Sequence, residues 1–135
     1  MTSLPDDSSE EQLKPFDGIR VVDFTHVLAG PSATYQLAVM GADVIKIEPR
    51  HEPDMYRKIG TSAELTKKGR GTEFLSQNGN KRSLSLDLSA PDGVAVARRL
   101  IETADVMVEN YRFGVMERHG PVSYTHLTLP TTPYV

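Results

Sequence analysis

Three short segments hold the side chains that could do chemistry in this sequence. Residues 25–31, 48–50 and 110–118 each follow a hydrophobic run that is typical of a buried strand. In open parallel sheets, ligands bind beyond the carboxyl ends of the strands. We therefore expect a binding site where these three segments meet.

The first of these segments, residues 25–31, leads into a predicted helix. The unpaired N–H groups and the positive dipole at the start of a helix suit a phosphate or a carboxylate. Gly30 is the only glycine of the segment, so the three-glycine pattern of an ordinary NAD site is missing and such a site is not expected. Glu48 lies where a ribose-binding acid would lie, but one acid does not define such a site.

His26 and Asp23 are the candidate proton carriers near this segment. Histidine titrates near neutrality without any perturbation. No second member of a catalytic triad is visible, and we favour a structural role in which His26 hydrogen-bonds backbone groups. Asp23 lies within the predicted strand, where a paired or hydrogen-bonded carboxylate is expected rather than a nucleophile.

Basic side chains could meet at one rim of the sheet. They are Lys81, Arg82, Arg112 and Arg118. Each alone is typical of a solvated surface charge, but together they could bind a ligand with several phosphates, because guanidinium groups match phosphate oxygens in bidentate geometry. Asn110 could hold the same ligand through its amide, or it could cap a turn. The residues therefore leave two hypotheses open, an enzyme that handles a nucleotide-derived cofactor and a non-catalytic nucleotide-binding or regulatory module.

The elements that must position these residues form an α/β pattern. Hydrophobic runs at residues 19–24 and 44–47 predict two strands, and Pro31 and Gly41 mark the start and end of a helix between them. A crossover of that length joins parallel strands, so residues 17–48 are expected to form one right-handed βαβ unit. Residues 1–15 are too polar to form a core and are expected to be a flexible leader.

Further elements follow a long connection. Residues 49–80 show no sustained periodicity and are expected to be a functional or mobile loop. Residues 83–88 alternate as a strand does, and a helix with Ser89 as its N-cap is expected to start there. Apolar residues at helical spacing predict that one face of this helix packs on the sheet; they are Val94, Ala97, Leu100, Ile101 and Ala104. A short buried strand at 106–108 and a short helix over 114–118 complete the pattern.

Composition excludes several classes of protein. The chain has 135 residues, a net charge of -3 and no cysteine. This fits one modest domain and argues against disulfides, thiolate chemistry and non-specific nucleic-acid binding. No apolar stretch reaches the roughly 18 residues that cross a bilayer, so no membrane partner is expected and the cytoplasm is the default location.

The end of the chain continues no earlier pattern. Residues 122–131 read VSYTHLTLPT, which fits the codons of a transposon-type sequencing adapter read in frame. We interpret residues 121–135 as a non-native tail and exclude them from the fold. His126 is therefore not a candidate base.

Four ordered blocks resemble one family. Residues 17–31 read DGIRVVDFTHVLAGP and residues 41–48 read GADVIKIE, followed by NKRSLSLDL at 80–88 and ADVMVENY at 104–111. They closely resemble the opening of the family III CoA-transferases, the formyl-CoA and carnitine CoA-transferase group, over residues 16–120. The resemblance implies a Rossmann-like parallel sheet with flanking helices, of which this chain is the incomplete N-terminal part, and an interlocked homodimer for the full-length protein.

The same resemblance implies an activity and a set of ligand contacts. Family members move coenzyme A from an acyl-CoA to a carboxylic acid, with no metal. The contacts with coenzyme A are carried over to Leu28, Ala29, Arg50, Leu86, Asp87, Leu88, Ser89, Asn110, Tyr111, Arg112 and Arg118. The formyl-CoA transferases carry a glutamine where this chain has Leu28, which departs from the formyl-CoA pattern.

The nucleophile of the family lies beyond the matching blocks. It is an aspartate that attacks the acyl-CoA, a case of covalent catalysis. No aspartate follows Asp105 in this chain, so we expect this polypeptide to be inactive by itself. An α-methylacyl-CoA racemase, which shares the opening blocks, is the alternative within the same superfamily.

Overall fold

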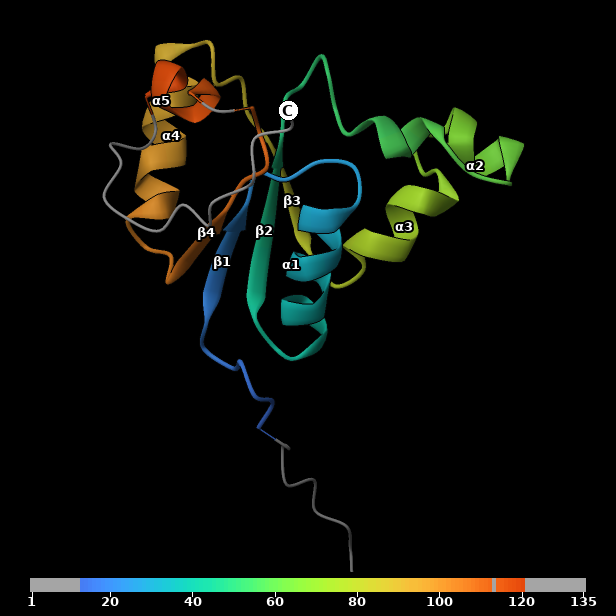
Figure 1. Ribbon diagram of the computed structural model, residues 1–135, viewed down its shortest axis with the longest axis horizontal. Helices are drawn as coiled ribbons and strands as arrows, with labels where there is room; N and C mark the ends of the chain where they lie inside the picture. The colour runs from blue at the N-terminus through green and yellow to red at the C-terminus, as the bar shows by residue number, and fades with distance from the viewer. Residues whose placement is uncertain (1–12, 113, 121–135) are drawn as a thin grey trace, which may run out of the picture.

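The computed structural model describes residues 13–112 and 114–120, and its strands form one parallel sheet (Figure 1). The strands are β1 (Arg20–Asp23), β2 (Asp43–Glu48), β3 (Arg82–Ser85) and β4 (Val106–Val108). They lie in the order β3-β2-β1-β4, and every neighbouring pair is parallel. The predicted α/β class is confirmed. The non-native tail predicted at 121–135 and the first twelve residues of the predicted leader lie outside the described residues.

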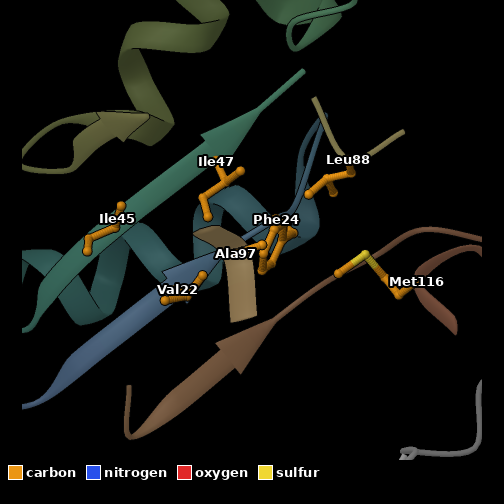
Figure 2. Packing of buried hydrophobic residues seen from close by; sticks show 7 residues of the cluster. All are labelled: Val22, Phe24, Ile45, Ile47, Leu88, Ala97 and Met116. Atoms are coloured by element: carbon orange, nitrogen blue, oxygen red, sulfur yellow. The ribbon is translucent and has the colours of Figure 1, made fainter. Parts of the chain in front are cut away.

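Helices cover both faces of the sheet. Helix α1 (Ala29–Val39) lies on one side, and α4 (Pro91–Ile101) and α5 (Val115–His119) lie on the other (Figure 1). Figure 2 shows Val22, Phe24, Ile45 and Ile47 converging with Ala97 of α4 on this second side. Four of the five residues predicted for the apolar face, Ala97, Leu100 and Ile101 of α4 and Ala104 just beyond it, belong to this core or pack against it, whereas Val94 does neither.

The α1 side of the sheet changes character along the strands. Side chains of a strand alternate between its two faces, so Val21 and Val44 face α1 and form a small apolar core with Ala38 and Ala42. Two residues further along β1 and β2, the same alternation brings Asp23 and Lys46 to this face, and both side chains are fully buried. The carboxyl half of this face is therefore a buried polar layer that needs internal partners.

The connection after β2 is helical, which the sequence did not predict. Residues 49–80 contain η1 (Met55–Lys58), α2 (Ala63–Lys67) and α3 (Thr72–Asn78). Side-chain caps start the first two, because Asp54 accepts from the amide of Tyr56 and Ser62 accepts from the amide of Leu65. Helices this short give no clear periodicity, so a loop was the wrong expectation.

Two smaller predictions are also wrong. The N-cap of α4 is Ala90 rather than Ser89, because the Ser89 hydroxyl donates to Asp87 and is not used for capping. Strand β4 was expected to be buried, but Val106 is 39% exposed, since β4 is an edge strand among the described residues. Within the described residues, no helix is long and apolar enough to cross a membrane.

Candidate functional site

The loop that follows β1 is fastened to the segment that follows β4. The amide of His26 donates to Oδ1 of Asn110 at 2.9 Å, and Nδ2 of Asn110 donates to the carbonyl of His26 at 2.8 Å. The His26 ring meets the Tyr111 hydroxyl, with Nε2 3.1 Å from the oxygen. Three sequence-predicted residues are thus brought together at the carboxyl edge of the sheet.

The surroundings of His26 favour its neutral form. Burial lowers the pKa of the imidazole, and the nearby Lys46 ammonium lowers it further. The predicted contact from the ring to backbone groups is not what the structure has, since the ring contacts the Tyr111 hydroxyl instead. Burial, followed by the charge of Glu109, raises the pKa of Tyr111 to about 12, so the phenol stays protonated at neutral pH.

Buried side chains outside the loop after β1 also contact its backbone. Lys46 Nζ donates to the carbonyl of Thr25 at 2.6 Å, and the Asp54 carboxylate accepts from the amide of Val27 at 3.2 Å. The Gln77 amide nitrogen faces the carbonyls of Val27 and Leu28 at 2.9 and 3.2 Å, the orientation that satisfies both groups. Lys46, Asp54 and Gln77 were not among the residues predicted from the sequence. The one available signal was Lys46 between Ile45 and Ile47 of a strand, because a buried lysine must find a partner.

Val27 has an unusual backbone conformation in this loop. Its φ is 73°, in the left-handed region that a β-branched residue rarely adopts. Such outliers persist only where the surrounding structure determines them, and they gather at ligand-binding sites. The contacts with Asp54 and Gln77 supply that constraint on both sides of the Val27 residue.

The predicted rim of four basic groups is not formed. Lys81 Nζ is buried and pairs with Asp23 at 3.0 Å, so it has no access to a ligand. Arg82 begins β3 and pairs with Asp43 at the start of β2, the amino end of the sheet and thus the wrong end. Basic residue type alone does not tell which end of the sheet a side chain reaches, and this is why the prediction failed for these two.

Asp23 is the paired carboxylate that the sequence predicted. Burial opposes its ionisation, but Lys81 and the hydroxyls of Thr25 and Thr34 outweigh burial and lower the pKa of Asp23. Burial in turn lowers the pKa of Lys81. The pair fixes the carboxyl end of β1 to α1 and to the start of β3.

Glu48 is occupied by the protein itself. Burial opposes its ionisation, yet the hydrogen bonds from Arg57 outweigh burial, and the pKa of Glu48 is lowered. The Arg57 guanidinium contacts both carboxylate oxygens at 2.9 and 2.5 Å and lies 3.7 Å above the Phe74 ring. A ribose-binding role for Glu48 therefore has no support, because both oxygens are taken within the chain.

The turn after β3 carries four predicted site residues. Asp87 accepts from the amide and the hydroxyl of Ser89, and these hydrogen bonds lower the pKa of Asp87. Leu88 is buried and Leu86 half-buried, and both pack into the core on the α4 side. Only the backbone of these two residues and the side chains of Asp87 and Ser89 are placed to meet a ligand.

A groove runs from this turn along α4 and α5. Its volume is about 620 Å³, and it is lined by Leu88, Ser89, Pro91, Val94, Ala95, Arg98, Arg99, Glu102, Arg118 and His119. Arg118 and Ser89, which the family resemblance assigns to one ligand site, thus line the same groove. Nδ1 of His119 lies 3.1 Å from the carbonyl of Leu88 and ties α5 to the turn.

The remaining predicted residues lie on the surface. Leu28 is 53% exposed and Ala29 is exposed at the first turn of α1, while Arg50 and Arg112 are exposed just beyond β2 and β4. Two groups of predicted residues therefore come together. The loop cluster is Asn110 and Tyr111, which contact His26, with Leu28 and Ala29 of the same loop. The groove cluster is Ser89 and Arg118, which line one groove. Among the described residues, no group of His, Cys, Asp and Glu is placed to hold a metal ion.

Several known proteins are similar to this chain in sequence. The chain is 46% identical over 107 residues to a formyl-CoA:oxalate CoA-transferase of Rhodopseudomonas palustris, which covers 79% of this chain and 24% of the relative. It is 40% identical over 110 residues to the succinyl-CoA:glutarate CoA-transferase of Mus musculus, which covers 82% and 24%. The chain spans about a quarter of the length of these curated relatives.

A solved structure and a family model agree with these relatives. A CAIB/BAIF family protein from Brucella suis superposes with a TM-score of 0.71 at 33% identity, over 84% of this chain and 30% of that one. The sequence model of CoA-transferase family III matches residues 16–128. This chain therefore belongs to CoA-transferase family III.

Proposed function

We propose that this chain is the coenzyme A-binding part of an enzyme that moves coenzyme A from an acyl-CoA donor to a carboxylic acid. The observation that carries the proposal is the groove cluster, where Ser89 and Arg118 share a groove with Arg99. Arg98 also lines the groove, but its guanidinium donates to the carbonyl of Gly120. Guanidinium groups bind phosphate oxygens in bidentate geometry, and coenzyme A is rich in phosphate.

The loop cluster supports the other end of the ligand. Leu28 and Ala29 are exposed at the start of α1, where unpaired amides and the helix dipole favour an anionic or strongly polar group. The exposed side chain of Leu28 suits the uncharged arm of coenzyme A, and the amide carbonyls of that arm can accept from the free N–H groups at the start of α1. We therefore propose that the phosphates lie in the groove and that the arm runs toward residues 25–29.

The donor and acceptor acids are not part of this proposal. Relatives of similar identity act on different acids, formyl-CoA with oxalate in one and succinyl-CoA with glutarate in another, by their names. The Leu28 side chain has no amide group that could hold a small polar intermediate, so we do not propose formyl-CoA as the donor. For the whole protein we propose a homodimer in the cytoplasm.

We also propose that the chain binds coenzyme A without turning it over. The family resemblance implies an aspartate nucleophile downstream of the matching blocks, and no aspartate follows Asp105 in this chain. Release of free thiol or transfer to succinate, oxalate or glutarate by the purified chain would contradict this part of the proposal, while leaving the binding site untouched.

Isothermal titration with coenzyme A tests the binding proposal. Arg118→Gln removes a groove cation and is expected to weaken binding on the order of tenfold, the size of a lost charge-assisted contact. Arg82→Gln removes the same charge at the amino end of the sheet and serves as the matched control, with affinity unchanged. If both variants lost the same affinity for coenzyme A, the loss would come from the change in net charge alone, which would contradict the groove assignment.

A further inference from the structure

We propose that Asp54 is a positioning residue that sets the conformation of the loop presenting Leu28 and Ala29. It does so by holding Val27 in its left-handed backbone conformation. The part of this inference that concerns coenzyme A rests on the proposed function, whereas the part that concerns the loop geometry does not. Nothing in the sequence pattern around Asp54 pointed to this role.

Packing does not explain why Val27 keeps its conformation. Its side chain is 38% exposed and that of the next residue, Leu28, is 53% exposed, so neither is held by a core. A valine with φ of 73° is sterically strained, because its branched Cβ crowds the backbone. Polar contacts from outside the loop must therefore offset the strain.

Asp54 provides the central one of these contacts. Its two carboxylate oxygens lie 3.3 and 3.2 Å from the Val27 amide nitrogen, and one of them also accepts from the amide of Tyr56 at 3.0 Å. Asp54 is 1% exposed, which strengthens the electrostatic part of these bonds. An amide that points at Asp54 is incompatible with free rotation of the Val27 backbone.

The carboxylate is itself fixed from two directions. Lys46 Nζ lies 3.5 Å from Asp54 and donates to the carbonyl of Thr25. The backbone amide of Asp54 donates to Glu48 at 3.0 Å, and Arg57 holds Glu48 in turn. Asp54 is thus a rigid acceptor, and the loop conforms to it rather than the reverse.

The neighbouring residues of the loop have anchors of their own, of which Lys46 also pairs with Asp54. Lys46 holds Thr25, Asn110 holds His26, and Gln77 holds the carbonyls of Val27 and Leu28. Among the contacts of the described residues, only Asp54 accepts from the Val27 amide. Loss of Asp54 is therefore expected to free the Val27 amide, which leaves Gln77 as the contact described here that resists a turn of the peptide between Val27 and Leu28.

Release of that peptide unit would change the binding surface. Valine without its acceptor returns to the ordinary negative range of φ, and the peptide that links Val27 to Leu28 turns with it. Leu28 and Ala29 follow directly and begin α1, so their amides and side chains would leave the position from which we propose they meet coenzyme A. Asp54 itself touches no ligand in this scheme.

The test compares three variants with the parent chain. Asp54→Ser keeps a short hydroxyl that can cap η1 but cannot reach Val27. Asp54→Asn keeps an acceptor at full reach without the charge, and is the reserve if the serine variant does not fold. Glu64→Gln removes an exposed carboxylate of α2 and is the matched control.

Amide hydrogen exchange at Val27 and titration with coenzyme A are the two measurements. Asp54→Ser also removes the carboxylate beside the buried Lys46, so its unfolding in urea is measured first. In the folded variant, exchange at Val27 is expected to rise on the order of tenfold, by more than exchange in β1, and binding is expected to weaken by a similar factor. Asp54→Asn is expected to show the same two changes to a smaller degree. Glu64→Gln is expected to change neither.

A second substitution separates positioning from simple capping. Val27→Gly accepts a positive φ without strain, so in the Asp54→Ser background it is expected to restore most of the lost affinity for coenzyme A. A capping defect in η1 would not be rescued by a glycine at position 27. Unchanged exchange at Val27 in both Asp54 variants, or failure of the glycine to restore binding, would overturn the inference.

Coenzyme A binding and the role of Asp54 in the loop are tested by different measurements. If the parent chain does not bind coenzyme A, the proposed function is contradicted, and exchange at Val27 still decides whether Asp54 holds the loop. If binding is intact and exchange does not respond to Asp54, the function stands and the positioning role is wrong.

Discussion

Asn110 bonds both the amide and the carbonyl of His26, although 84 positions separate the two residues in the chain. A side-chain amide that satisfies a donor and an acceptor of one residue replaces a rung of backbone pairing. The end of β4 is thereby joined to the end of β1 beyond the last ladder contact of the two strands, Asp23 with Val108. The edge strand of the described sheet thus shapes the binding loop at its centre.

Asn110→Leu should loosen the loop more than it destabilises the fold. Asn110 is exposed, so water can take over the freed groups of His26, and we expect a stability loss of about 1 kcal/mol. Exchange at the His26 amide should accelerate by more than the exchange of β1. An equal acceleration in both places would mean that Asn110 acts on global stability and not on the loop.

Lys81→Met should be severely destabilising. It leaves the fully buried Asp23 without its cationic partner, and breaking a buried pair in this way costs about 3–5 kcal/mol. Arg82→Gln breaks the exposed pair with Asp43 at the neighbouring position and should cost at most about 1 kcal/mol. Urea unfolding of the two variants checks this, and similar losses would show that Asp23 does not depend on Lys81.

The His26 imidazole should titrate below its ordinary value of 6.5. Because the folded pKa is lower than the unfolded pKa, the unfolded chain binds more protons between the two values. The contribution of His26 to stability is therefore complete above about pH 6.5 and is lost as the pH falls through the folded pKa. An NMR titration of the ring carbons measures the pKa directly, and a value at or above 6.5 would refute the assigned surroundings.

Gly93→Ala should destabilise the protein, although alanine is the better helix former. A Cβ at Gly93 in α4 would overlap the carbonyl of Asp87, which belongs to the turn of the groove cluster. We expect a loss of about 1–3 kcal/mol from this overlap, opposite in sign to the gain of about 1 kcal/mol that propensity alone predicts. Thermal or urea unfolding gives the sign.

Ala95→Gly, in the same helix, is the matched control for that substitution. Ala95 is exposed, so only helix propensity should act and the variant should lose about 1 kcal/mol. A stabilising Gly93→Ala would show that α4 and the Asp87 turn are not in close contact.

Most of the fold could be predicted from the sequence, because strands, helices and turns each left a residue pattern within a short stretch of chain. Dense apolar runs predicted β1 and β2, and Pro31 and Gly41 marked the two ends of α1. The observed elements differ from the predicted ones by one or two residues at their ends. The turn after β3 and the helix after it were also readable, although Ser89 was assigned to the wrong cap.

The candidate site was predictable only in part. Topology gave the segments at residues 25–31 and 110–118, because they follow strands, and the family resemblance assigned Leu28 and Tyr111 within them. Lys46, Asp54 and Gln77 could not, since their role depends on contacts between β2, η1 and α3 that leave no periodic trace. Lys81 was misassigned for a related reason, because a long side chain can turn inward toward a buried carboxylate.

Mapping coenzyme A onto the chain by residue-resolved NMR tests the central claim most directly. We predict shifts on addition of coenzyme A at two places, Leu28 with Tyr111 in the loop cluster and Ser89 with Arg118 in the groove cluster, with none at Arg82 and Asp43 at the amino end of the sheet. No saturable shift at any residue, or shifts confined to the amino end, would contradict the assignment of this sheet edge to coenzyme A.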